Sequence, residues 1–172
     1  MGQENKEKVL EVFYEFPQKR FTVREIANVA KVPRATAHKI LVGLKKDGMV
    51  DGEGRAVWSR LFLSRKVAYY VDKIVSSGLI DFLVKELNPS AIVLFGSISK
   101  GDSVKESDVD IFVSSYVEDK MKIEMNLDMK KFEKKIGHRV QLHLYDNIKD
   151  VNEHLRGNIA NGIKLEGFLK IW

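Results

Sequence analysis

Two aspartates, Asp108 and Asp110, lie two positions apart at the start of the run 108–114, in which Asp108, Asp110 and Phe112 alternate with Val109, Ile111 and Val113. The alternation predicts a β-strand, and on a strand both carboxylates project from the same face. Two neighbouring carboxylates repel each other, so such a pair is usually sustained by a cation. Mg²⁺ suits the pair because it accepts few protein ligands and completes its shell with water and phosphate oxygens. We therefore expect Asp108 and Asp110 to bind magnesium.

A Gly-Ser pair, Gly96 and Ser97, stands upstream of the aspartates, directly after the apolar run 91–95. The continuous apolar run predicts a strand that is covered on both faces. Gly96 has no Cβ, which lets a triphosphate approach the backbone, and the Ser97 hydroxyl can donate a hydrogen bond to phosphate. The alternative interpretation is a glycine turn followed by an unrelated acidic strand edge.

Together these residues resemble the nucleotidyltransferase superfamily that includes DNA polymerase β and the minimal nucleotidyltransferases. The family pattern is an apolar strand, Gly-Ser, a loop of about ten residues and Asp-x-Asp, and residues 94–112 match it in order. Lys100, Gly101 and Ser107 also fit the pattern of the small enzymes. The resemblance spans residues 88–172 and implies a small mixed sheet with flanking helices. It also implies transfer of a nucleoside monophosphate from a Mg²⁺-bound nucleoside triphosphate to a hydroxyl of a protein or nucleic-acid acceptor.

The resemblance further implies a role for each matching residue. Asp108 and Asp110 would be the catalytic residues and would hold Mg²⁺, and Lys100 would offset phosphate charge. The β and γ phosphates would lie against Gly96 and Ser97, and Ser107 completes the expected nucleotide-binding set.

One family residue has no counterpart of the same type. The third carboxylate of the family usually lies on the next strand, where the best-aligned residue of this chain is Gln141. An amide cannot accept a proton from the attacking hydroxyl. His143 is either a base or a structural hydrogen-bonder, and Asp146 follows the strand in a turn. The site is therefore either a working transferase or a degenerate one that senses nucleotide or scaffolds a dimer.

The segment before this domain shows helical periodicity. Apolar stripes predict helices over 5–16 and 34–46, and Thr22 with Glu25 forms a capping box that starts a helix between them. Gly48 would end the third helix, and two glycines within 49–58 predict a hairpin. Residues 21–50 resemble winged helix-turn-helix transcription regulators, and the resemblance implies a double-stranded DNA ligand.

The charge distribution supports a DNA ligand. Residues 18–60 contain ten Lys and Arg but only four acidic residues, whereas the chain after Arg65 is nearly neutral. Arg34 and Thr36 lie at the helix end that would enter the major groove. Phosphate contacts are expected from Lys39, Lys45 and Lys46, and Arg55 at the hairpin tip would reach a minor groove or backbone. A merely solvated basic surface is the alternative.

We therefore expect a two-domain chain of the α+β or α/β class: a winged helix-turn-helix over 1–64, a helical linker over 65–87 and a nucleotidyltransferase-like domain over 88–172. Further predicted elements are helices over 65–76, 79–87, 118–136 and 148–161, a strand over 139–145 and a closing segment over 162–171.

The composition excludes some classes of protein. There are no cysteines, which excludes disulfides and thiolate metal sites, and no apolar run approaches the ~20 residues that span a bilayer. A cytoplasmic protein without membrane contact is expected. A winged helix usually binds DNA as a homodimer, so a second copy of the chain is one expected partner. Small proteins of the nucleotidyltransferase family that this chain resembles often act as antitoxin partners of a HEPN ribonuclease, so such a ribonuclease is another. A DNA-binding regulator, a DNA-targeted transferase and a degenerate binding module remain the three hypotheses.

Overall fold

The computed structural model describes residues 2–116 and 127–170 and divides into two compact units. The first unit runs to Lys66 and includes Ser103–Lys105, and the second contains the other described residues. The boundary falls inside helix α4 (Arg60–Ser76), so residues 67–87 of the predicted linker group with the second unit.

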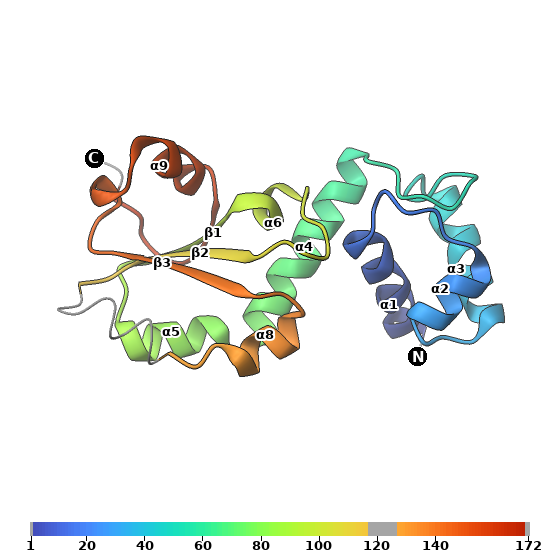
Figure 1. The fold of residues 1–172 in the computed structure, drawn as a ribbon, viewed down its shortest axis with the longest axis horizontal. Coiled ribbons are helices and arrows are strands. Elements are labelled where there is room, and N and C mark those ends of the chain that lie inside the picture. Colours follow the sequence, from blue (N-terminus) through green and yellow to red (C-terminus); the bar gives the residue numbers. More distant parts are fainter. Residues whose placement is uncertain (1, 117–126, 171–172) are drawn as a thin grey trace. The chain divides into compact units, whose positions relative to one another are not determined.

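Three helices form most of the first unit: α1 (Gly2–Glu15), α2 (Val23–Val29) and α3 (Arg34–Lys46) (Figure 1). The capping box is confirmed, because Thr22 Oγ1 accepts a hydrogen bond from the Glu25 amide at 3.3 Å and the Glu25 carboxylate accepts from the Thr22 amide at 2.8 Å. At the end of α3, Gly48 has a φ of 66° and so adopts the left-handed conformation that stops the helix.

An aromatic and aliphatic core holds the three helices together. The rings of Phe13 and Phe21 meet edge to face with centroids 5.8 Å apart, and Tyr14 meets Phe62 in the same way at 5.3 Å. From α3, the buried side chains are Ala37, Leu41 and Leu44.

The predicted hairpin over 49–58 is reduced to a tight turn. Its ladder is a single antiparallel bridge between Val50 and Ala56. Backbone hydrogen bonds also close the turn, from the Val57 amide to the Met49 carbonyl and from the Asp51 amide to the Arg55 carbonyl, both at 2.9 Å. The Phe21 amide holds its tip by donating to the Gly54 carbonyl at 2.9 Å. A Cβ on Gly54 would collide with the Phe21 carbonyl, so this close approach requires glycine.

Helix α4 begins five residues before its predicted start at Arg65. Ser59 explains the earlier start, because its hydroxyl accepts a hydrogen bond from the Phe62 amide at 3.1 Å and thus caps the first turn. The next helix, α5 (Leu79–Leu87), agrees with the prediction and buries Leu79, Ile80, Leu83 and Leu87.

The described part of the second unit contains a four-stranded mixed sheet in the order β3-β2-β1-β4. Strand β1 (Ala91–Phe95) pairs antiparallel with β2 (Val109–Ser114) and with β4 (Ile163–Gly167). Strand β3 (Val140–Tyr145) pairs parallel with β2. All of β1 is buried, as its continuous apolar run predicted.

Helices cover both faces of this sheet (Figure 1). One face carries α9 (Glu153–Ala160) and the 3-10 turn η1 (Ile148–Asp150), whose apolar side chains pack on Val93, Phe95 and Phe112. Helices α5 and α8 (Lys130–Ile136) lie on the other face, where Phe82 and Phe132 meet with ring centroids 5.0 Å apart.

Two further predicted helices differ from the structure. For the helix predicted over 118–136, residues 118–126 lie outside the described residues, residues 127–129 are not helical, and α8 begins at Lys130. The helix predicted over 148–161 is divided into η1 and α9, because Asn147 and Asn152 each cap a separate turn.

Within the described residues, each helix is too short or too polar to serve as a membrane span.

Candidate functional site

The turn after β1 brings Gly96 against a carboxylate from the neighbouring strand. Asp110 lies opposite Phe95 in the antiparallel ladder, so its side chain stands beside the residue that follows β1. Gly96 has a φ of 74°, and a Cβ there would collide with the Asp110 carboxylate. Glycine is therefore required for both its backbone conformation and its lack of a side chain.

The residues after Gly96 form a short helix, α6 (Gly96–Lys100), which the sequence did not predict. Gly101 ends it in the left-handed conformation with a φ of 81°. The hydroxyl of Ser97 is partly exposed and makes no hydrogen bond with the described residues, so it is available to a ligand.

Lys100, at the end of α6, is held by helix α9. Its Nζ donates to Asn158 Oδ1 at 3.2 Å. Helix α9 itself packs on the sheet, because its buried Ile159 lies in the same apolar cluster as Val93 and Phe95 of β1. The Lys100 ammonium therefore has a neutral partner, and its charge is not cancelled at this contact.

Asp108 directly precedes β2, two residues before Asp110, which is the spacing at which residues of a strand share a face. The Asp108 carboxylate is partly exposed and makes neither a hydrogen bond nor an ion pair with the described residues. This leaves its oxygens available to a cation.

The third-carboxylate position is occupied as the sequence indicated, by an amide. Gln141 is the direct partner of Asp110 in the parallel ladder of β2 and β3, and it is exposed. His143 lies two residues further along the same face, with Nε2 at 3.4 Å from Asp110 Oδ1. Its ring also meets the edge of Phe95 at 4.9 Å between centroids. Asp146 follows the far end of β3, so the length of that strand separates it from Asp110.

A buried histidine that the sequence analysis did not single out supports the residue before Asp108. His138 Nδ1 lies 2.6 Å from the Ser107 carbonyl, which is only an acceptor, so Nδ1 carries the proton and donates it. On the other side of the ring, the Tyr70 hydroxyl lies 3.3 Å from His138 Nε2. No sequence signal marks this role, because the two partners are 31 and 68 residues from His138.

The donor set fits a magnesium ion that arrives with phosphate. No group of three or more His, Asp or Glu side chains in the described chain forms a complete metal cage. Mg²⁺ does not need one, because it is typically bound by one or two carboxylates together with substrate phosphates and water. Asp108, with its unengaged carboxylate, and Asp110 at the Gly96 turn provide that number of ligands.

Comparison with known proteins identifies the second unit. A family model described as Polymerase beta, Nucleotidyltransferase matches residues 78–165, which is about half of the chain. The chain belongs to this nucleotidyltransferase family. The match covers α5, the whole sheet as far as Leu165 and the Gly-Ser and Asp-x-Asp residues. Searches of curated proteins and of solved structures found no match.

Outside the nucleotidyltransferase domain, three of the predicted DNA-binding residues lie in the first half of α3, namely Arg34, Thr36 and Lys39, whereas Lys45 and Lys46 are its last two residues. A shallow hollow of about 430 Å³ beside the start of α3 is lined by Val23, Arg34, Ala35, His38 and Lys39. Arg34 and Lys39 are exposed, whereas Thr36 is half-buried.

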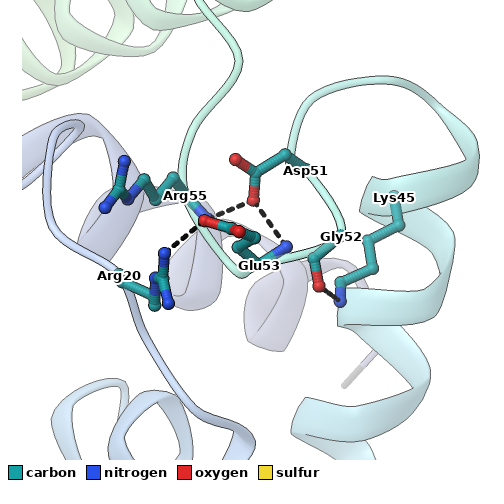
Figure 2. Close-up of polar contacts among 6 residues, drawn as sticks. All are labelled: Arg20, Lys45, Asp51, Gly52, Glu53 and Arg55. Carbon is teal, nitrogen blue, oxygen red and sulfur yellow. Dashed lines mark hydrogen bonds and ion pairs between the residues drawn. The ribbon is translucent and has the colours of Figure 1, made fainter.

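The other predicted DNA contacts lie at or near the turn after α3, shown in Figure 2. Lys45 Nζ donates to the Gly52 carbonyl at 2.9 Å, so this side chain is engaged in holding the turn. Asp51 Oδ1 accepts from the amides of Glu53 and Arg55, at 2.9 and 2.8 Å, and these hydrogen bonds lower the pKa of the Asp51 carboxyl.

Two acids therefore share this turn with the basic residues. Glu53 forms an ion pair with Arg20, and Arg55 stands at the end of the turn next to the bridging residue Ala56 (Figure 2). Lys46 and Arg55 are exposed. Of the predicted set, the side chains of Arg34, Lys39, Lys46 and Arg55 make no hydrogen bond or ion pair within the described residues.

Proposed function

We propose that the nucleotidyltransferase domain binds a nucleoside triphosphate with Mg²⁺ and transfers its nucleoside monophosphate to a hydroxyl. The observation that carries this proposal is the contact between the Asp110 carboxylate and the Gly96 turn. That contact joins the two halves of the family pattern, one suited to phosphate and the other to a cation.

Each residue has a distinct part in this proposal. Asp108 and Asp110 would hold Mg²⁺, which when bound neutralises phosphate charge. The triphosphate approaches the backbone of the Gly96 turn, beside the Asp110 carboxylate that packs against it. Ser97 donates a hydrogen bond to phosphate, and Lys100 supplies positive charge from the end of α6.

Because Gln141 stands where the family usually has a carboxylate, a second candidate function is nucleotide binding without transfer. Without a carboxylate beside Asp110, the residue that would accept the proton of the attacking hydroxyl is missing. His143 is the available base on the same face, because its Nε2 lies 3.4 Å from Asp110. If it does not serve, the domain binds Mg²⁺–NTP without turnover and acts as a nucleotide sensor.

Incubation with labelled ATP or CTP and Mg²⁺ distinguishes the two activities. Release of pyrophosphate that is abolished by Asp108→Ala and by Asp110→Ala supports the transferase. Tight binding of the nucleotide without pyrophosphate supports the sensor. Absence of Mg²⁺-dependent nucleotide binding contradicts both.

For the first unit, we propose a winged helix-turn-helix that binds double-stranded DNA with α3. The exposed Arg34 and Lys39 at the hollow beside the start of α3 support this role. A mobility shift on the DNA upstream of the gene tests it. Arg34→Ala and Lys39→Ala should weaken binding and reduce its salt dependence, whereas Asp110→Ala should leave binding unchanged.

Partners follow from this second proposal. A DNA-binding regulator with a nucleotidyltransferase domain would bind as a homodimer and could act as the antitoxin partner of a HEPN ribonuclease, which it would modify with a nucleotide. Sedimentation with and without DNA tests the dimer. Coexpression with a HEPN protein encoded beside it, where one exists, tests the partner.

A further inference from the structure

The backbone just before β2, the strand that carries Asp110, is held by residues that are not part of the Gly-Ser and Asp-x-Asp pattern. Ser107 and Asp108 come before β2, so no sheet ladder fixes the Ser107 carbonyl. That carbonyl accepts the hydrogen bond from His138 Nδ1 at 2.6 Å. One residue beyond Asp108, the Val109 amide donates to the Arg139 carbonyl at 2.8 Å. The residues on either side of Asp108 are therefore both hydrogen-bonded, one to His138 and the other to Arg139.

His138 is built into its position. It is 5% exposed, and its ring meets Tyr70 edge to face with centroids 5.1 Å apart. The Tyr70 hydroxyl lies 3.3 Å from Nε2, on the side of the ring away from Ser107. A buried imidazole with a partner at each nitrogen has a fixed orientation, and its donor is therefore aimed at one place.

Asp108 needs such support more than Asp110 does. The Asp110 carboxylate packs against Gly96 and lies near His143, but the Asp108 carboxylate makes no hydrogen bond or ion pair within the described residues. Its backbone therefore fixes the point and the direction from which the side chain starts, the Cα–Cβ bond.

We propose that His138 is a positioning residue that orients Asp108 for Mg²⁺ by holding the Ser107 carbonyl. This inference rests on the proposed binding of Mg²⁺–NTP. Partners that orient metal ligands typically change metal affinity by about 10- to 100-fold when they are lost.

Three substitutions of His138 separate positioning from packing. His138→Asn places an amide nitrogen the same number of bonds from Cα as Nδ1, so it can still donate to Ser107. His138→Gln places its amide one bond further out, toward the position of Nε2. His138→Phe keeps the ring and its packing on Tyr70 but has no donor.

The measurements are the Mg²⁺ concentration needed for half-saturation with NTP, by calorimetry, and the free energy of unfolding of each variant. We expect His138→Asn to need a Mg²⁺ concentration close to that of the unsubstituted protein. His138→Gln and His138→Phe should need about tenfold more. Stability should follow a different order, with His138→Phe the most stable of the three because it fills the buried space.

Two results would contradict the positioning role of His138 without contradicting the proposed function. One is normal Mg²⁺ dependence in His138→Phe, and the other is a Mg²⁺ requirement that simply follows the order of stability. If the unsubstituted protein binds no NTP in Mg²⁺, the proposed function itself fails and the positioning role fails with it.

Discussion

The Asp110 carboxylate occupies the space into which a Cβ on Gly96 would project. Two residues separated by fourteen positions in the chain are thus packed so closely that one of them cannot carry a side chain. The antiparallel register that pairs Phe95 with Asp110 creates this contact, so it is a property of the sheet and not of the intervening loop.

Gly96→Ala should therefore destabilise the domain and weaken nucleotide binding. The alanine would collide with Asp110 and would also have to adopt a φ of 74°, which costs about 1 kcal/mol or more. Gly157→Ala is the matched control, because a Cβ there meets nothing within 4 Å and alanine favours the helix. Thermal unfolding of both variants tests the prediction, and equal stability of the two would contradict it.

Gln141→Asp should strengthen the proposed catalytic activity. The new carboxylate would lie beside Asp110 in the parallel ladder and would provide the proton acceptor that an amide cannot. We expect the rate of pyrophosphate release to rise at least about tenfold at saturating Mg²⁺. Gln141→Asn, which shortens the amide without adding charge, is the control. A rate that is unchanged or lower in Gln141→Asp would show that this strand position does not serve the reaction.

Lys45→Met should loosen the turn after α3, because it removes the donor to the Gly52 carbonyl. The expected loss of stability is about 0.5–1 kcal/mol, the net value of one hydrogen bond. Lys46→Met removes the same charge from a neighbouring exposed side chain and should leave the stability almost unchanged. Denaturant unfolding measures both variants. DNA titrations then test whether Lys45→Met loses more affinity than its control, as a loosened turn predicts.

Tyr14 should make the first unit sensitive to alkaline pH. Burial raises its pKa to about 12, and the charge of Arg65 opposes this shift only in part. Because the folded pKa lies above the ordinary value of 10.0, the contribution to stability is complete below pH 10.0 and is lost as the pH rises toward 12.

A titration of tyrosinate absorbance should show that Tyr14, one of the five tyrosines, ionises late. Tyr14→Phe should remove that late phase. Titration of all five tyrosines together near their ordinary pKa would contradict the prediction.

The sequence predicted best what short-range chemistry determines. Thr22 and Glu25 cap α2 because the two side chains need only one helical turn to reach each other. The buried strand β1 was likewise visible as a continuous apolar run.

Contacts made through the fold were not predictable in this way. Lys45 is one of the residues predicted to contact phosphate. Its hydrogen bond to the Gly52 carbonyl was not predicted, because it depends on how the turn after α3 brings Gly52 close to the helix. Helix α6 has only five residues, too few for any periodicity to show. His138 reaches Ser107 only because β3 lies parallel beside β2, and that pairing requires a crossover that no local pattern reveals.

The order of the strands bears on how the proposed nucleotide site would respond to heating. Both halves of the family pattern stand at the two inner strands of the sheet, with β3 and β4 outside them. Inner strands exchange their amide hydrogens only when the whole domain opens, whereas edge strands and termini open locally. Heating should therefore preserve the nucleotide site until the domain melts as one cooperative unit, so inactivation and unfolding would share a single midpoint.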